Sequence, residues 1–145
     1  MSIQRNEQGF YEWPDYTPPS LGIESDRLEE CLAHCREHSY RGVFGSPPLG
    51  FCETDLNFLK QIPAVESLWF WDVELNDVDA IYELPQLAHL GINPKRPGID
   101  FARLGNLKTA INHWNKRDSG IANSSIEMYH LWRFNPRVKS FSEAE

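Results

Sequence analysis

Apolar residues recur in four similar segments of the chain. The first segment runs from Ile62 to Phe70, and the segment from Leu84 to Ile92 repeats its residue types 22 positions later. A third copy starts at Leu104, 20 positions further on, and a shorter fourth copy starts at Ile126. The equivalent apolar anchors are Val65, Leu87, Leu107 and Ile126. A repeat of this length predicts a stack of similar supersecondary units.

Two hydrophobic periods follow one another within a unit. Leu68 and Phe70 lie two positions apart, which is the spacing along one face of a β-strand. Leu75, Val78 and Ile81 are three positions apart, which is the spacing of a 3₁₀ turn. Each unit is therefore predicted to be a short strand followed by a short return segment. Neither can bury its apolar side alone, so we expect the units to stack in parallel around a shared core.

This pattern resembles the leucine-rich-repeat family, and within it the internalin-like class, whose period is about 22 residues. The resemblance covers roughly residues 55–134 and is that of a short, standalone, bacterial-type member. It implies an α/β leucine-rich-repeat solenoid with short parallel strands, 3₁₀ or irregular convex segments and an N-terminal capping helix. The sequence departs from the family at the asparagine that usually caps each strand, where the aligned residues are Val73, Lys95, Asn115 and Phe134. Only Asn115 fits, so we expect irregular turns, helped by Pro94 and Pro97.

The residues before the repeats are predicted to close one end of the stack. Asp26 and Glu29 have the spacing of a capping box, and the apolar positions from Leu28 to Cys35 predict a helix that ends near His38. Residues 40–45 are predicted to form a first, degenerate strand, with a loop at 46–50. We interpret residues 1–145 as one domain, with an extended aromatic arm at 1–24, an N-terminal cap at 25–54, repeats at 55–139 and a fraying tail at 140–145.

The positions between the apolar anchors are predicted to form a binding surface. Because strand side chains alternate, these positions face away from the core, on the concave side of the stack. The predicted partner-binding residues on this face are Trp69, Trp71, His89, Asn93, His113, His130 and Trp132, and Asp72, Trp114 and Arg133, just past the strand ends, are predicted to form its rim. Exposed aromatic patches with polar rims are typical of interaction sites, and tryptophan and arginine are preferred hot-spot residues. The alternative is that some of these tryptophans fold back to cover the core.

The charge of the chain narrows the choice of partner. With 21 acidic and 14 basic residues, the formal net charge is −7, which disfavours nucleic acid and anionic lipid and favours a basic protein. The N-terminus has no apolar signal segment, and no stretch approaches the roughly 18 apolar residues of a membrane helix, so we expect a cytoplasmic protein. Cys31, Cys35 and Cys52 lack the spacing of a disulfide scaffold and are expected to be free, buried thiols.

A metal site on the predicted helix is one chemical alternative. His34 and His38 are four positions apart and, with Cys31 and Cys35, form a possible set of zinc ligands. One helix rarely surrounds a tetrahedral ion, however, and both cysteines complete the apolar stripe of the helix. We therefore expect no bound metal.

Catalysis by the histidines of the predicted surface is a second alternative. His89, His113 and His130 occupy different positions relative to their anchors, so we expect them to lie about 8 Å or more apart, too far for one metal ion. No nucleophile or glycine-rich phosphate loop accompanies them, and the segment Asp118 to Gly120 is interpreted as a turn. We expect neither enzymatic activity nor a cofactor.

The leading hypothesis is a non-enzymatic protein-binding module that uses the concave, aromatic and histidine-rich face. Within this class, an inhibitor or immunity protein that neutralises a basic, toxin-like partner fits the small size and the negative charge. Two other hypotheses stay open. One is a small molecule or glycan stacked on Trp71 and Trp132 beside His130. The other is a histidine-based enzyme that depends on His113.

Overall fold

The strands of the chain form one sheet in which spatial order follows chain order, from β1 to β8. The computed structural model describes residues 3–113, 115–120 and 128–132, with the backbone alone at 94, 112–113 and 128–132. The strands are β1 (Gln4–Arg5), β2 (Tyr11–Trp13), β3 (Ser20–Gly22), β4 (Gly42–Gly45), β5 (Ser67–Glu74), β6 (His89–Lys95), β7 (Thr109–His113) and β8 (Met128–Trp132). The β1–β2 and β2–β3 pairs are antiparallel and the later pairs are parallel. The fold is therefore α/β, with a largely parallel sheet and, in the described residues, one α-helix, α1 (Leu28–Glu37).

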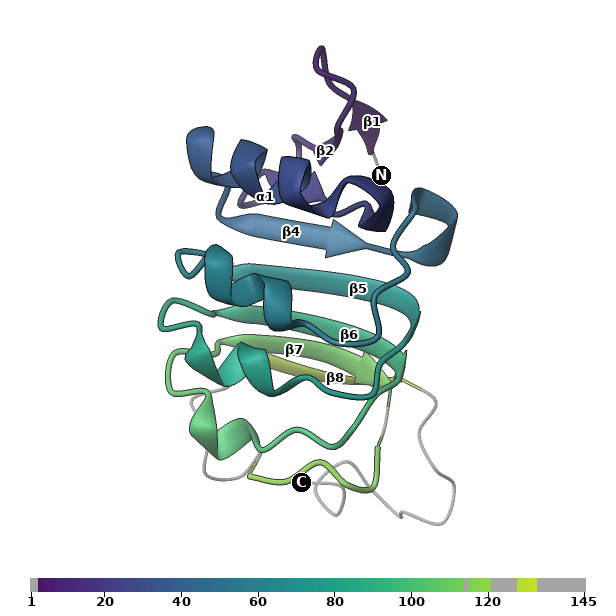
Figure 1. Ribbon diagram of the computed structural model, residues 1–145. Helices are drawn as coiled ribbons and strands as arrows, with labels where there is room; N and C mark the ends of the chain where they lie inside the picture. Colours follow the sequence, from purple (N-terminus) through teal and green to yellow (C-terminus); the bar gives the residue numbers. More distant parts are fainter. Residues whose placement is uncertain (1–2, 114, 121–127, 133–145) are drawn as a thin grey trace.

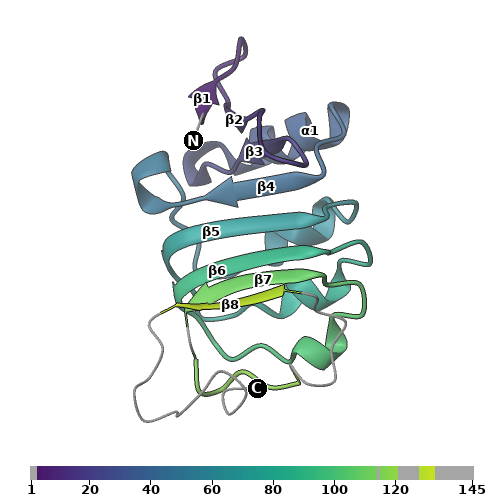
Figure 2. The same cartoon turned by 180° about the vertical axis from the view of Figure 1, so that it is seen from behind.

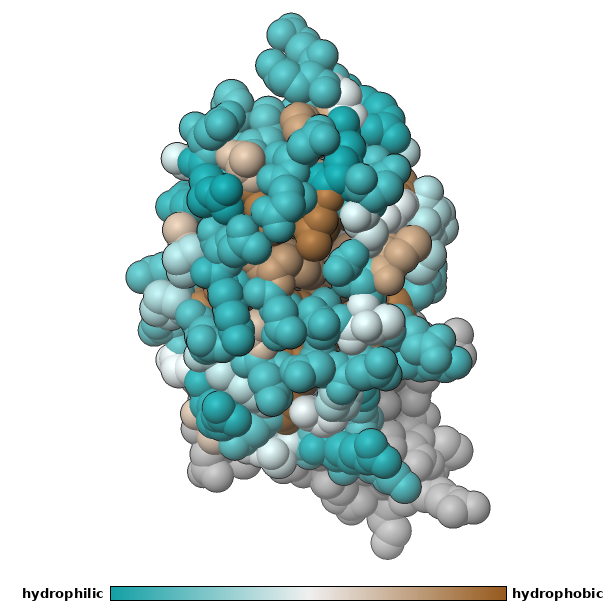
Figure 3. Space-filling model, in the orientation of Figure 1, coloured by the Kyte–Doolittle hydropathy of each residue, from teal (hydrophilic) through white to brown (hydrophobic). Residues whose placement is uncertain are grey.

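One face of the sheet is covered by α1 and by 3₁₀ turns (Figure 1). The turns are η1 (Ser25–Arg27), η2 (Pro47–Leu49), η3 (Asn57–Gln61), η4 (Asp79–Glu83) and η5 (Phe101–Arg103). The exterior of this covered side is mostly polar, with apolar residues visible in the space beneath α1 (Figure 3). In the described part of the chain, no helix or 3₁₀ turn lies over the opposite face (Figure 2). We refer to that face as the open face.

The core lies between the sheet and these turns. Leu68 and Phe70 of β5 are buried, and the Phe70 ring lies 4.8 Å from that of Phe51 and 6.3 Å from that of Phe58 in η3. Burial of each such side chain stabilises the fold by about 1.5–3 kcal/mol relative to exposure. Leu90 of β6 continues the apolar layer. The inward side of the strands is thus the side that the two-residue period predicts.

The strand pairing confirms the repeat register of the sequence. Ser67 pairs with His89, His89 with Thr109, and Thr109 with Met128, which reproduces the offsets of 22, 20 and 19 residues between copies. The return segments after β5 and β6 contain the 3₁₀ turns η4 and η5, as the three-residue period predicts. The β5–β6 register shifts between Phe70 and Val73. Asp72 occupies this bulge with a φ of 59°.

The capping box predicted before the helix is wrong. Asp26 lies inside η1, and α1 begins at Leu28 with Arg27 at its N-cap and no side-chain cap hydrogen bond. The nearby Ser25 does not cap the helix either, because its Oγ accepts a hydrogen bond from the Cys52 amide at 2.7 Å. The helix ends at Glu37, with His38 as its C-cap, close to the predicted end.

The N-terminal arm is extended, as predicted, but it is also part of the sheet. β1 and β2 form an antiparallel hairpin, β2 pairs with β3, and β3 pairs in parallel with β4. The predicted degenerate strand at 40–45 is β4. The arm and the predicted cap therefore extend the sheet beyond the first regular repeat.

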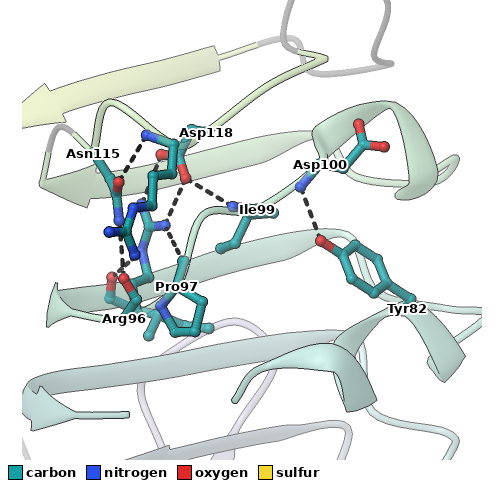
Figure 4. A network of polar contacts seen from close by, with 9 residues as sticks. Tyr82, Arg96, Pro97, Ile99, Asp100, Asn115 and Asp118 are labelled. Carbon is teal, nitrogen blue, oxygen red and sulfur yellow. Dashed lines mark hydrogen bonds and ion pairs between the residues drawn. The ribbon is translucent and has the colours of Figure 1, made fainter. Parts of the chain in front are cut away.

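A buried ion pair joins the loops that follow β6 and β7 (Figure 4). Arg96 donates to both carboxylate oxygens of Asp118 at 2.7 and 2.8 Å, and the two side chains are 1% and 4% exposed. The Ile99 amide also donates to Asp118, and Asn115 Nδ2 donates to the Arg96 carbonyl. The turn lies at Lys116 and Arg117, just before the segment interpreted as a turn, and Ser119 forms a β-bridge with Asp100. The interpretation of residues 118–120 as a turn is therefore wrong, and it misses the Asp118 carboxylate, which links two successive units.

Candidate interaction surface

Aromatic side chains gather on the open face near its N-terminal end. Phe44, Trp69 and Trp71 alternate along β4 and β5 with residues that point into the core. The Phe44 and Trp71 rings are stacked with centroids 6.1 Å apart. Trp13 of β2 meets Phe44 edge-on at 6.0 Å and packs against Tyr16 at 4.6 Å. We refer to Trp13, Tyr16, Phe44, Trp69 and Trp71 as the aromatic cluster.

Two glycines make room for these rings. A Cβ atom on Gly91 would lie 2.4 Å from the six-membered ring of Trp69, so this ring lies over β6. A Cβ atom on Gly22 would lie 3.2 Å from the Phe44 ring and 2.7 Å from Tyr11 Cβ. Phe44 is fully buried by these neighbours, whereas Trp69 and Trp71 stay partly exposed. The tryptophans therefore lean over neighbouring strands on the open face and do not fold back into the core.

A row of polar side chains runs beside the aromatic cluster. Ser67, His89 and Thr109 occupy equivalent register positions on β5, β6 and β7. His89 Nδ1 is 2.7 Å from Thr109 Oγ1, and both side chains are partly exposed. His89 therefore lies on the open face, as predicted from the sequence.

Asn93 is a correction to the predicted site. Its side chain is 5% exposed, and Nδ2 donates to the backbone carbonyl of Ile111 at 3.2 Å. The amide thus holds β6 against β7. A residue buried in this way contributes to the fold and offers little surface to a partner.

A cleft of about 340 Å³ lies where β5 ends. Three carboxylates line it, from Glu53, Asp72 and Glu74, together with Pro47, Phe51, Cys52, Val73, Thr54 and Asn76. Among the described residues, these carboxylates form no ion pair at 4.0 Å or less, although Lys95 is the cross-strand neighbour of Glu74. Asp72 directly follows Trp71 in β5, although no residue of the aromatic cluster lines the cleft itself.

The rest of the predicted site falls on β7, β8 and beyond. The backbone pairs Ile111 with His130 and His113 with Trp132. His89, His130 and His113 therefore occupy three different register positions, which confirms the predicted offset between them. Trp114 and Arg133, and the side chains of His113, His130 and Trp132, lie outside the described residues.

Sequence reasoning missed the part of the cluster that comes from the N-terminal arm. Trp13, Tyr16 and Phe44 do not belong to the four repeats, so the repeat register said nothing of their positions. The alternation of Tyr11, Glu12 and Trp13 is a weak strand signal, and the neighbouring prolines concealed it. Only the pairing of β2 with β3 brings Trp13 to the open face.

The cysteines of α1 belong to the core. Cys31 and Cys35 are buried, and desolvation raises the pKa of both thiols, that of Cys35 to about 11. Cys52 is exposed, so the expectation that all three thiols are buried is wrong.

The described residues contain no group of three or more histidine, cysteine or acidic side chains arranged to hold a metal ion.

Residues of α1 and of the N-terminal hairpin line a polar pocket of about 430 Å³. His34, His38, Tyr40, Glu12 and Asn6 line it together with Gln4, Arg5, Glu7 and Gln8. Tyr40 donates to Glu12 at 2.9 Å, and burial, followed by this hydrogen bond, raises the pKa of Tyr40 to about 12. The hydroxyl is therefore protonated at neutral pH and connects β2 to the segment before β4.

No helix in the described part of the chain is both long and apolar enough to cross a bilayer. Comparisons with models of protein families, with curated proteins and with solved structures found no match to this chain.

Proposed function

We propose that this chain is a short leucine-rich-repeat solenoid that binds a basic protein through the aromatic cluster on its open face. We further propose that it acts without catalysis, as an inhibitor or immunity-type protein that neutralises a toxin-like partner. The observation that carries the proposal is that β5 presents two partly exposed tryptophans, Trp69 and Trp71, on the open face and ends at a cleft lined by carboxylates.

The tryptophans supply the apolar part of the proposed contact. Trp and Tyr side chains dominate binding hot spots, because a rigid ring buries a large area at a small cost in entropy. Trp71 is held by stacking on Phe44, and Trp69 rests over Gly91. Side chains that are already positioned in this way lose little freedom when a partner covers them.

The carboxylates supply the charge selectivity. Glu53, Asp72 and Glu74 line the same cleft, and their negative charges would attract a lysine or arginine of a partner. The net charge of −7 acts in the same direction at longer range and would steer a basic protein toward the chain.

The repeat geometry supports the solenoid assignment. β5, β6 and β7 pair in parallel and in the register of the sequence repeat, and a 3₁₀ turn on the covered face separates each from the next. Stacked units of this kind present an extended surface on their strand side, which repeat proteins use for binding.

Affinity capture from extracts of the native source tests this proposal. The tagged chain should retain a basic protein, Trp71→Ala and Trp69→Ala should each weaken binding about tenfold or more, and added salt should weaken it further. Gln86→Ala, at an exposed turn residue, is the control and should bind like the unmodified chain. Recovery of no protein, or of one that binds the Trp71 variant equally well, would exclude the proposal.

Sugar binding remains the second candidate, since partly exposed tryptophan rings also stack on pyranose faces. Titration of tryptophan fluorescence with a glycan panel separates the two functions. A saturable change with one glycan, lost in Trp71→Ala, would favour the sugar.

A further inference from the structure

The β1–β2 hairpin (residues 4–13) has two faces with different neighbours. Trp13 joins the aromatic cluster on the open face through Phe44. Glu12, one position earlier, accepts from Tyr40 on the covered side of the sheet. Trp13 is also held by the pairing of β2 with β3, so a movement of the hairpin shifts Trp13 relative to Phe44 when it displaces β2 from β3 as well.

The loop of the hairpin is attached to α1 through His34. The Phe10 ring stacks on the imidazole with centroids 4.2 Å apart and an interplanar angle of 18°. Asn6 Nδ2 lies 3.3 Å from His34 Nε2. Arg27 adds a hydrogen bond to the Gly9 carbonyl at 2.7 Å and lies over the Phe10 ring.

Hydrogen bonds within the loop determine which atom of Asn6 faces His34. Asn6 Oδ1 accepts from the backbone amides of Gln8 and Phe10, each at 3.0 Å. The NH₂ group is therefore the group that points at the imidazole, and it can only donate. His34 Nε2 must accept, so the docked hairpin requires neutral His34 with its proton on Nδ1.

Protonation of His34 opposes this contact. The imidazolium carries a hydrogen on Nε2, which would face the NH₂ group of Asn6 with no acceptor between them. Rotation of the Asn6 amide does not solve the conflict, because it turns the NH₂ group toward the amides of Gln8 and Phe10. Protonated His34 is therefore incompatible either with the Asn6–His34 contact or with the hydrogen bonds from the Gln8 and Phe10 amides to Asn6.

The charges around His34 act in opposite directions. Arg27 before α1 and His38, whose ring centroid is 4.3 Å away, oppose a positive charge, whereas Glu37 of α1 and Glu12 of β2 favour it. Arg5 and Glu7 of the hairpin line the same pocket, as does Tyr40, which is committed to Glu12. Desolvation, followed by His38, outweighs the carboxylates and lowers the pKa of His34 below its usual 6.5.

We propose that the Asn6–His34 contact is a pH-sensitive attachment that holds the β1–β2 hairpin, and with it Trp13, in the binding surface and releases both on mild acidification. The lowered His34 pKa determines how the stability of the docked hairpin changes with pH. The docked hairpin is favoured above pH 6.5 and loses stability as the pH falls from 6.5 toward the lower pKa of the docked state. The consequence for partner binding rests on the proposed function, but the release itself does not.

Hydrogen exchange of the full chain, measured by mass spectrometry and corrected for intrinsic rates, tests the release. Between about pH 7.5 and about pH 5.5, the hairpin amides should exchange about tenfold faster for each unit of His34 pKa depression, while β5 and β6 stay protected. His34→Gln does not titrate and should abolish this pH dependence. His89→Gln, at a histidine on the open face, is the matched control and should retain it.

Asn6→Asp tests the same contact with the opposite sign. A carboxylate at position 6 can still accept from the Gln8 and Phe10 amides and can also accept from protonated His34. Its hairpin should exchange more slowly at acidic pH than at neutral pH. Hairpin exchange that is unaffected by pH in the unmodified chain, or that accelerates equally with acid in Asn6→Asp, would overturn the proposal, whether or not a protein partner is found.

Discussion

Gly91 decides where Trp69 lies. The equivalent positions on the neighbouring strands are Trp69, Ile111 and His130, so glycine interrupts a row of larger residues. The Trp69 ring occupies the space that a side chain at this position would fill. A single missing Cβ atom thus turns an exposed ring into one that is positioned against β6.

Gly91→Ala is expected to displace Trp69 and to destabilise the protein by about 1–3 kcal/mol, because the new Cβ atom overlaps the ring and approaches the Ile111 carbonyl. Urea denaturation measures the loss. Gly105→Ala is the matched control, since a Cβ atom there meets nothing within 4 Å and should cost no stability. Equal stability of the two variants would mean that Trp69 does not lie over Gly91.

At the scale of elements, the loops after β6 and β7 depend on charged side chains. The leucine-rich-repeat resemblance leads one to expect an asparagine after every strand, but Lys95 and Val73 occupy two of those positions. Beyond β6 the buried Arg96 donates to the Ile92 carbonyl and to Asp118 of the next loop, while Asn115 donates back to the Arg96 carbonyl. Both members of this ion pair therefore also hydrogen-bond backbone groups, Arg96 the Ile92 carbonyl and Asp118 the Ile99 amide.

Asp118→Ala should destabilise the protein by about 3–5 kcal/mol, because it leaves the Arg96 guanidinium buried without its carboxylate. The control is Glu66→Ala, which removes the more exposed ion pair with Arg41 and should cost about 1 kcal/mol or less. Both values come from urea denaturation. If the two losses were equal, the Arg96–Asp118 pair would not be buried in solution.

At the scale of the whole molecule, the two faces of the sheet carry different kinds of residue. The covered face buries the apolar anchors, and the open face carries the aromatic cluster and the polar row with His89. Substitutions on the two faces should therefore affect different properties.

Leu87→Ala should cost about 2–5 kcal/mol, since Leu87 is 2% exposed and its removal leaves a cavity in the core. His89→Ala, two positions later, should cost about 1 kcal/mol, the value of its hydrogen bond to Thr109. Thermal or chemical unfolding of both variants measures the difference. Similar losses would mean that the inward and outward faces are assigned wrongly.

The sequence by itself determined the repeat, its register and the covered side of the strands. Those features follow from local periodicity, because a strand or a 3₁₀ turn places every second or third residue on one face wherever it occurs. The pairing of Ser67, His89, Thr109 and Met128 was therefore predictable from spacing alone.

Only the tertiary structure decided how residues far apart in the chain meet. It brought Trp13 to Phe44, Asn6 to His34 and Arg96 to Asp118, and it buried Asn93, which the register alone had placed on the binding surface. No periodic pattern in the sequence predicts these contacts, because each depends on how the arm and the loops pack against the folded sheet. The repeats fix where the open face lies, and the non-repeating segments decide which side chains complete it.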